Sequence, residues 1–357
     1  MKILYVGYYN PHFITVTEYV ERALRGLGHE VETVNYRDWL IPGRIRSRVP
    51  ALDLWDTRRI NRDLVRKAEV FRPEVLIVFG ATNIYPETIA EIKRRFDPVT
   101  VSMVADFPMG FDFHLMAGPY YDHFFPSGTD GLLQYQKAGH TNGYWLPFGC
   151  DPEIHRPIEL TCEERKKYGS DICFVGSYYT EREVILEPLA GFDLGLWGIG
   201  WEKLPKGSPL RRHVRGGSLR PDEWVKVFNA AKIVINIVAR RADVREPFAF
   251  SLKDDDFRMC NTRVFEILGC GAFQMVNRKD DVLKLFKDKE HIALFDEKRP
   301  DEVPASVEYY LTHADERRRI AAAGRREAVE KHTYRSRMEY LFTVINKGRS
   351  LNERYSG

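Results

Sequence analysis

Residues 261–276 have the sequence NTRVFEILGCGAFQMV, which predicts a helix followed directly by a strand. Helical spacing places Val264, Phe265 and Leu268 on one apolar face, and a glycine after Leu268 ends the helix. The apolar run 273–276 is typical of a buried strand. This stretch is therefore one helix–strand unit of an α/β fold.

The same alternation continues through the second half of the chain. We expect strands at 171–175, 194–197, 233–237 and 273–276, and helices at 181–189, from 221 to about 231, at 261–268 and from 306 to the end. Pro221 suits the first turn of its helix, because the amide hydrogen that proline lacks has no helical partner there. Alternation of this kind predicts a parallel sheet with helices on both faces.

The first half of the chain repeats this pattern. We expect strands at 2–7, 31–34, 75–79, 100–104, 123–126 and 144–146, and helices at 58–71, 86–96 and 131–138. A further helix should begin after Thr15, because Thr15 and Glu18 have capping-box spacing. A broken, charged linker between Gly149 and Gly169 separates the two halves. The expected domains are residues 1–160 and 161–333, each an α/β doubly wound unit.

Composition limits the classes of function. The 357 residues suffice for two domains of ordinary size. The 54 basic and 51 acidic residues give a net charge of +3, so nucleic acid is not implied as a partner. The five cysteines are odd in number and form no Cys-x-x-Cys pair, which argues against a disulfide framework and against a zinc site. We therefore expect reduced thiols, and the sequence sets no oligomeric state.

Targeting and nucleotide motifs are also informative. The first apolar run is too short for a signal peptide, and no run approaches the roughly 18 apolar residues of a spanning helix, so a cytoplasmic protein is expected. Basic clusters at 44–48 and 317–319 leave peripheral membrane contact open, although solvated surface charge is the simpler interpretation. Neither 7–12 nor 176–181 fits the G-x-G-x-x-G fingerprint, and no P-loop is present. A nicotinamide enzyme or an NTPase is therefore disfavoured.

Several motifs occur in a recognisable order along the chain. They are Leu146-Pro147-Phe148-Gly149-Cys150-Asp151-Pro152, Phe174-Val175-Gly176-Ser177 with Arg182, Trp197-Gly198 with Trp201, Ala231-Lys232-Ile233-Val234-Ile235-Asn236, Asn261-x-Arg263-x-Phe265-Glu266 with Cys270-Gly271, and His332-Thr333-Tyr334 with Arg337. Together they resemble the GT-B-fold glycosyltransferases, and most closely the CgeB-like spore-maturation branch related to glycosyltransferase group 1. The resemblance covers most of the chain.

The resemblance implies two Rossmann-like doubly wound domains that face a cleft. The N-terminal domain would bind the acceptor and the C-terminal domain a nucleotide-sugar, while a last helix at 334–357 crosses back to the N-terminal domain. The implied reaction transfers a sugar from a UDP-, GDP- or dTDP-sugar to an unidentified acceptor hydroxyl. No cofactor or metal is expected to be required.

The resemblance also implies roles for individual residues on the donor side. Spacing alone favours a surface ion pair between Arg263 and Glu266. In the family, however, the acid corresponding to Glu266 holds the ribose hydroxyls, which a carboxylate does well because it offers two acceptor oxygens. The arginines would then neutralise the diphosphate, and backbone amides after the strand at 171–175 would face phosphate or sugar unless they form an ordinary turn. The expected donor-binding set is Glu266, Arg263, Arg182, Gly176, Ser177 and Asn261.

Catalysis needs a general base that takes the proton of the acceptor hydroxyl. Asp106 follows a predicted strand and resembles a loop of the family, although it would equally well accept backbone amides in a turn before Pro108. His12 is the rival base, because an unperturbed histidine pKa suits this role, and His114 ranks third. Group 1 retaining enzymes carry a second acid eight positions before Glu266, where this chain has Arg258, so a retaining outcome is not carried over.

Two matters stay open beside this interpretation. Asp254-Asp255-Asp256 contains an Asp-x-Asp pair of the kind that holds a divalent metal in the other glycosyltransferase fold, but a solvated loop is favoured and no metal site is expected. A nucleotide-sugar epimerase of the same fold would convert the donor without an acceptor. A non-catalytic nucleotide-sugar-binding or coat-assembly protein would retain the fold without turnover.

Overall fold

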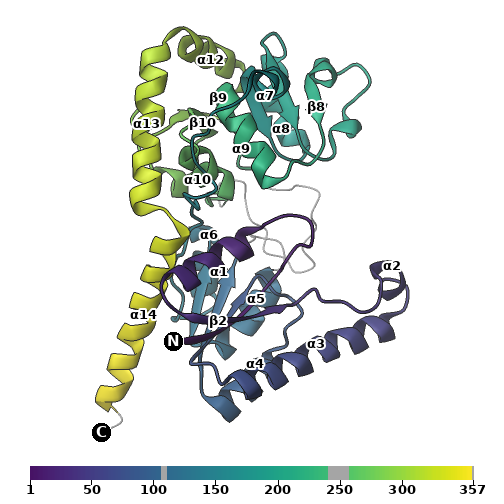
Figure 1. Ribbon diagram of the computed structural model, residues 1–357, viewed down its shortest axis with the longest axis vertical. Coiled ribbons are helices and arrows are strands. Elements are labelled where there is room, and N and C mark those ends of the chain that lie inside the picture. Colours follow the sequence, from purple (N-terminus) through teal and green to yellow (C-terminus); the bar gives the residue numbers. More distant parts are fainter. Residues whose placement is uncertain (106–110, 240–256, 356–357) are drawn as a thin grey trace. The chain divides into compact units, whose positions relative to one another are not determined.

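The computed structural model describes residues 1–105, 111–239 and 257–355. These residues form two compact units, each of which is described by itself (Figure 1). Among the described residues, unit 1 contains 1–105, 111–147 and 335–355, and unit 2 contains 148–239 and 257–334. The chain thus leaves unit 1 after Pro147 and returns to it after Tyr334.

Unit 1 is built on a parallel sheet with the strand order β2-β1-β3-β4-β5. The strands are β1 (Lys2–Gly7), β2 (Glu30–Asn35), β3 (Val75–Phe79), β4 (Val99–Val104) and β5 (His123–Pro126). The prediction of a strand at 144–146 is wrong. The amides of Tyr144 and Leu146 donate to the carbonyls of Phe124 (2.8 Å) and Pro126 (3.0 Å), so this segment runs beside β5 without completing a ladder.

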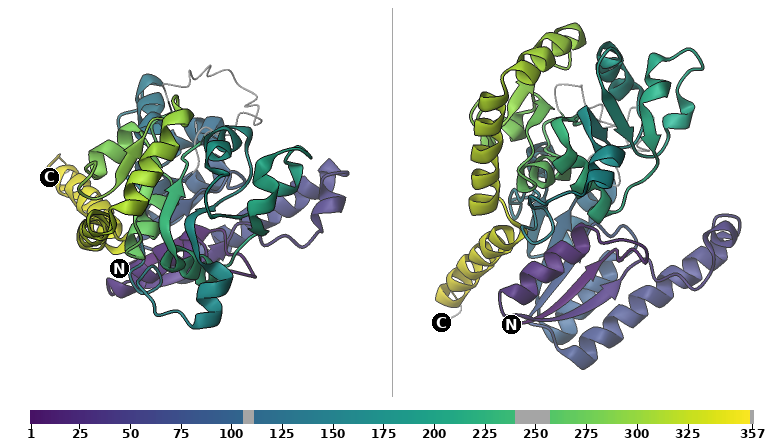
Figure 2. Two further views of the ribbon diagram at one scale, coloured as in Figure 1. Left: turned by 90° about the horizontal axis from the view of Figure 1, so that it is seen from above. Right: turned by 45° about the horizontal axis from the view of Figure 1, so that its top comes forward.

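Helices cover both faces of this sheet. They are α1 (Val16–Gly26), α2 (Gly43–Arg46), α3 (Pro50–Phe71), α4 (Pro86–Phe96), α5 (Phe111–Ala117), the short η1 (Gly118–Tyr120) and α6 (Thr129–Lys137). The long helix α3 runs along the sheet (Figure 2), and its apolar side chains share a buried core with α4, β1 and β3. The capping box predicted for α1 is confirmed, since Thr15 and Glu18 each accept from the other's backbone amide.

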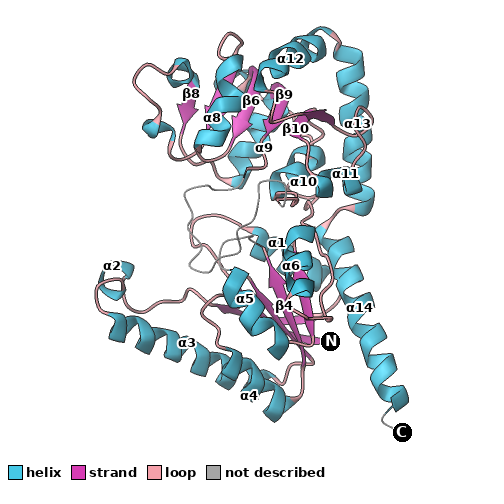
Figure 3. Ribbon diagram, turned by 180° about the vertical axis from the view of Figure 1, so that it is seen from behind, coloured by secondary structure: helices cyan, strands magenta, loops and turns pink. Residues whose placement is uncertain are grey.

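The C-terminal helix α14 (Tyr334–Tyr355) packs on unit 1 (Figure 3). Arg335 donates from Nη1 to the carbonyl of Gly26 (3.0 Å), and Arg337 donates from Nε to that of Pro147 (3.0 Å). The Phe342 ring lies 4.6 Å from the imidazole of His29, centroid to centroid. These contacts fix α14 beside the end of α1.

Unit 2 contains a second parallel sheet with the order β11-β10-β9-β6-β7-β8. The strands are β6 (Ser170–Val175), β7 (Leu194–Trp197), β8 (Val214–Gly216), β9 (Ala231–Asn236), β10 (Gln274–Asn277) and β11 (Ala293–Phe295). The helices are α7 (Cys162–Tyr168), α8 (Thr180–Leu186), α9 (Pro221–Ala230), α10 (Thr262–Gly269), α11 (Asp280–Leu285), α12 (Val303–Thr312) and α13 (Ala314–Lys331), with short 3-10 turns η2 (Glu187–Leu189), η3 (Trp201–Lys203), η4 (Pro209–His213) and η6 (Pro300–Glu302).

Both faces of the second sheet are buried. Ile172 and Phe174 of β6 pack on the face covered by α8, α12 and α13, whereas Cys173 and Val175 pack on the face covered by α7, α9 and α10. The predicted α/β doubly wound class is therefore confirmed for both units. The linker predicted between 149 and 169 is only partly irregular, because its charged stretch forms α7 behind a Thr161–Glu164 capping box.

All five cysteines are free, and four of them are buried. Among the residues that the structure describes, no helix combines the length and the apolar composition that crossing a membrane requires.

The α1 cap yields a first test. Thr15→Ala removes the side-chain acceptor of the capping box, and we expect it to lower the free energy of unfolding of unit 1 by about 1 kcal/mol in urea denaturation. Thr15→Ser keeps a hydroxyl acceptor and should stay close to the wild type. Equal losses in both variants would show that the cap hydrogen bonds do not stabilise α1.

Candidate functional site

All six residues of the expected donor-binding set lie in unit 2, at one edge of its sheet. Gly176 and Ser177 follow β6, and the neighbouring Arg182 lies on α8. The amino end of α10, which carries Asn261, Arg263 and Glu266, is at the same edge, because α10 leads back into the parallel strand β10. Ligands of open parallel sheets bind beyond the carboxyl ends of the strands, so topology brings this set to the expected place.

The loop after β6 is held tightly against the loop after β7. The Gly176 amide donates to the carbonyl of Trp197 (2.8 Å), and the Trp201 indole donates to the carbonyl of Gly176 (3.0 Å). Gly198 has a φ of +141°, and a Cβ there would lie 2.0 Å from the Gly176 oxygen, so only glycine fits. The Gly176 amide is already hydrogen-bonded to Trp197. Ser177 is therefore the better candidate in this loop to donate a hydrogen bond to an anion.

Arg182 ties this loop to the end of β9. Its Nη1 donates to the carbonyl of Ser177 (2.7 Å), its Nη2 donates to that of Ile237 (3.3 Å), and its guanidinium carbon lies 4.5 Å from the ring centroid of Tyr179. Burial lowers the pKa of Arg182 to about 10, and the positive charge of Arg263 contributes to this shift. The guanidinium is still charged at neutral pH, so the site holds two neighbouring cations.

Arg263 and Glu266 form the ion pair that their spacing predicts, but the pair is not on the surface. Arg263 Nη1 bonds Glu266 Oε2, and the Glu266 side chain is only 4% exposed against 23% for Arg263. The Arg263 guanidinium carbon stacks 4.0 Å from the ring centroid of Trp224. Glu266 therefore lies beneath Arg263, and a ligand that approaches the pair meets the arginine first.

His155 is buried, and its imidazole interacts electrostatically with this pair. Burial lowers the pKa of His155, while the carboxylates of Glu266 and Asp151 oppose that shift. His155 accepts at Nδ1 from the Asp151 amide (2.9 Å). The carboxylate of Glu266 thus has Arg263 as its cationic partner.

A network of side-chain amides fixes the start of α10. Asn261 caps the helix by accepting from the Val264 amide, and it exchanges hydrogen bonds with Asn236 of β9 (3.0 and 3.1 Å). Asn236 also donates to Gln274 of β10 (3.1 Å), whose own amide donates to the carbonyl of Val264 (3.1 Å). Asn261 is therefore occupied in positioning α10. Gln274 belongs to no sequence motif, because its role depends on strand order.

A hollow of about 250 Å³ lies at the carboxyl ends of β7 and β8. Trp201, Glu202 and Arg211 line it together with glycines 198, 216 and 217. Trp201 belongs to one of the ordered sequence motifs, whereas Arg211, Gly216 at the end of β8 and Gly217 after it belong to none of them. The hollow adjoins the loop of Gly198, so it is continuous with the edge that carries the donor-binding set.

The catalytic candidates lie elsewhere in the chain. His12, in the loop after β1 of unit 1, is exposed, and its amide donates to Oδ1 of Asn10 (2.9 Å). Asp106 and the acidic run 254–256 are outside the described residues. His114 is buried in α5, and burial lowers its pKa to about 4, so it is neutral at pH 7 and poorly accessible. Of the three histidine and aspartate candidates, His12 is the one that the structure describes as accessible.

Metal ligands do not gather in the described ranges. No group of three or more His, Cys, Asp or Glu side chains there is arranged to hold an ion. Arg258, which stands where the retaining family pattern has an acid, lies 3.6 Å from Asp280 in an ion pair.

Comparisons with known proteins find similar sequences and folds. Residues 182–343 match the family model described as glycosyl transferase-like, a range that contains Arg182, Arg263 and Glu266. The chain is 24% identical over 277 residues to the spore protein CgeB of Bacillus subtilis (strain 168), which covers 75% of this chain and 81% of the relative.

Solved structures agree in fold across nearly the whole chain. Sucrose-phosphate synthase from Thermosynechococcus elongatus superposes with a TM-score of 0.67 at 10% identity, covering 99% of both chains. Anabaena Alr3699/HepE in complex with UDP-glucose superposes with a TM-score of 0.66 at 10% identity, covering 97% of this chain and 100% of that one.

The chain thus has the GT-B fold of these solved structures, and residues 182–343 match a glycosyl transferase-like family model. Its sequence is similar to that of CgeB, as the ordered motifs predicted.

The buried ion pair yields a second test. Arg263→Ala leaves the Glu266 carboxylate buried without its cation, and we expect a loss of about 3–5 kcal/mol in the free energy of unfolding of unit 2. The matched double variant Arg263→Met/Glu266→Leu removes both charges and should recover most of that loss in urea denaturation. A double variant as unstable as the single one would contradict a dominant role of the unpaired carboxylate.

Proposed function

We propose that unit 2 binds a nucleotide-sugar at the carboxyl edge of its sheet and that unit 1 binds the acceptor, whose hydroxyl receives the sugar without help from a metal ion. The observation that carries this proposal is the pair of neighbouring guanidinium groups, Arg182, which bonds backbone carbonyls, and Arg263, which bonds the Glu266 carboxylate. The local excess of positive charge matches a diphosphate, whose charge grows as the sugar leaves.

Arg263 and Glu266 would act together when the donor binds. Arg263 is the more exposed partner, so an incoming diphosphate can compete with Glu266 for its Nη groups. The carboxylate that this exchange releases would accept hydrogen bonds from the two ribose hydroxyls. Arg182 would hold the loop at Ser177 in place while its remaining charge attracts the phosphates.

The donor base would bind in the same unit. The hollow beside Trp201 has an aromatic wall and the polar side chains Glu202 and Arg211, which suits a planar heterocycle with donors and acceptors on its edge. Anabaena Alr3699/HepE is described in complex with UDP-glucose, so uridine nucleotides are the first choice for this chain.

For the acceptor, His12 or Asp106 would take the hydroxyl proton while the nucleoside diphosphate departs. His12 is exposed in the loop after β1, at the carboxyl edge of the unit 1 sheet. We also propose a reducing, cytoplasmic setting, in keeping with the five free cysteines.

Donor binding is tested by thermal unfolding with UDP, GDP, dTDP, ADP and CMP, and then with their sugars. A ligand at 100 times its dissociation constant stabilises the native state by about 2.7 kcal/mol, which is readily seen as a melting shift. We expect one diphosphate to stabilise the wild type, and Glu266→Gln to weaken its binding at least about tenfold, since hydrogen bonds to charged groups contribute about 1.5–3 kcal/mol.

The control for this experiment is Arg326→Ala, which removes an exposed cation of α13 away from the site and should bind like the wild type. No stabilisation by any nucleotide would contradict the proposal and favour a non-catalytic assembly protein. Conversion of the donor sugar to its epimer without an acceptor would favour an epimerase.

Metal independence is tested separately. Because guanidinium groups are proposed to neutralise the diphosphate, donor-sugar turnover should change less than about twofold between excess EDTA and added Mg²⁺ or Mn²⁺. Turnover that is abolished by EDTA and restored by the metal would show that an ion performs this task.

A further inference from the structure

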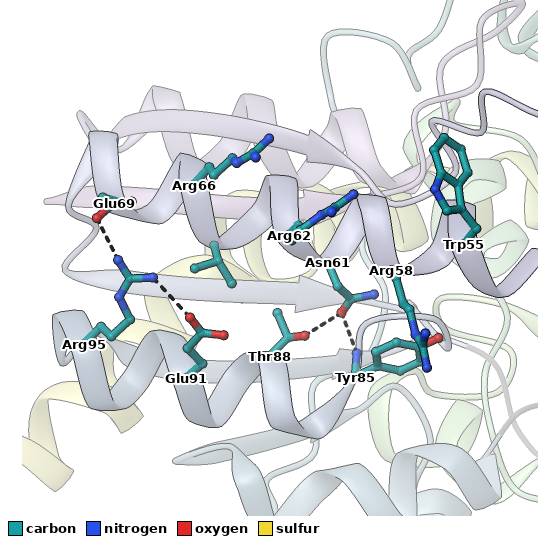
Figure 4. A pocket seen from close by; sticks show the side chains of 11 residues that line it. Trp55, Arg58, Asn61, Arg62, Arg66, Glu69, Tyr85, Thr88, Glu91 and Arg95 are labelled. Carbon is teal, nitrogen blue, oxygen red and sulfur yellow. Dashed lines mark hydrogen bonds and ion pairs between the residues drawn. The ribbon is translucent and has the colours of Figure 1, made fainter.

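A groove of about 650 Å³ separates α3 from α4 in unit 1, well within the range of ligand sites (Figure 4). Neither the sequence motifs nor the donor site involves it. Its walls are unusually basic, because Arg58, Arg62, Arg66 and Arg95 all line it together with the aromatic Trp55 and Tyr85. The groove therefore has the charge of a site for an anionic ligand.

The floor of the groove is rigid. Asn61 of α3 is buried, and its Nδ2 donates to the carbonyls of Thr57 (2.9 Å) and Asn83 (2.8 Å). Its Oδ1 accepts from the Tyr85 amide (2.9 Å) and from the Thr88 hydroxyl (2.8 Å), so one side chain joins α3 to the first turn of α4. The two walls are thus fixed before any ligand binds.

The arginines of the groove differ in whether an acidic residue neutralises their charge. Arg95 is neutralised by Glu69 (2.7 Å) and Glu91 (3.1 Å), which closes one end with ion pairs. In the described part of the chain, no ion pair is found for Arg58 or Arg62, so their charges face the groove and solvent.

The open end lies at the functional edge of the unit 1 sheet. Helix α3 leads into β3, so its first turns, with Trp55 and Arg58, lie at the carboxyl edge, and Tyr85 precedes α4 at that same edge. Figure 4 shows Arg58, Arg62 and Arg66 following one another along α3. Their spacing of four residues corresponds to about 6 Å per step along the helix.

These features suit a chain of sugars that carries negative charges. Aromatic rings stack on the apolar faces of sugars, and arginine forks bind carboxylate and phosphate groups. Trp55 is 48% exposed and available for such stacking. A flat anionic membrane fits less well, because the groove is concave and two acidic residues, Glu69 and Glu91, line its far end.

We propose that this groove binds an acidic oligosaccharide segment, the class of acceptor to which the enzyme adds its sugar. The acceptor role rests on the proposed function, whereas binding in the groove does not. Arg58 and Arg62 would hold the acidic groups, and Trp55 would stack on a sugar nearer the reacting end.

The test is calorimetric titration of the full chain with three oligosaccharides of equal length. One is oligogalacturonate, with a carboxylate on each sugar, another is a phosphorylated maltooligosaccharide, and the third is its neutral parent. We expect at least one acidic ligand to bind at least about tenfold more tightly than the neutral one, and the tighter of the two identifies the acidic group. Arg58→Ala/Arg62→Ala should weaken that binding by about tenfold or more.

The matched control is Arg44→Ala/Arg94→Ala, which removes the same charge from exposed positions of α2 and α4 outside the groove and should stay within about twofold of the wild type. Equal losses in both double variants, no binding of either acidic ligand, or equally tight neutral binding would overturn the proposal. So would capture by phosphatidylglycerol vesicles through Arg58 and Arg62 without binding of either acidic oligosaccharide. UDP stabilisation should be unchanged in both double variants, so failure of the groove is distinguishable from failure of the donor site.

Discussion

A carboxylate that is almost wholly removed from water has to be paired, and in this protein that constraint falls on Glu266. Its partner Arg263 stacks on Trp224 and keeps partial access to solvent. The amide network of Asn261 and Asn236 fixes the helix that carries both charges. The site is thus held in one arrangement by its own interactions, and it retains a cation that a stronger anion can attract.

Parallel topology explains how distant parts of the chain reach one site. The loop after β6, the start of α8 and the start of α10 are separated by up to about ninety residues, yet all follow strands of one sheet. In unit 1 the same rule places the loop of His12 and the open end of the basic groove at the carboxyl edge of the first sheet. Each unit therefore presents its chemically distinctive side chains at one edge.

Local signals allowed much of the fold to be predicted. The short apolar runs at 75–79 and 194–197 are strands with those bounds, and Asn261 does begin its helix. The prediction of a strand failed at Tyr144–Leu146, where the segment donates hydrogen bonds to β5 but does not form a ladder with it. The prediction of a linker failed at α7, because the charged residues of that helix resemble those of a linker.

Site chemistry was less accessible, because burial is a tertiary property. Spacing predicts the pair of Arg263 with Glu266 but neither the burial of Glu266 nor the stacking of Arg263 on Trp224. The arginines of α3 form a groove because Asn61 fixes α4 beside them. The most direct measurement of the central claim is a crystal structure of the full chain with UDP bound. We expect Arg263 to contact a phosphate and Glu266 to contact the ribose hydroxyls. An intact pair of Arg263 with Glu266, with the nucleotide bound elsewhere, would contradict this expectation.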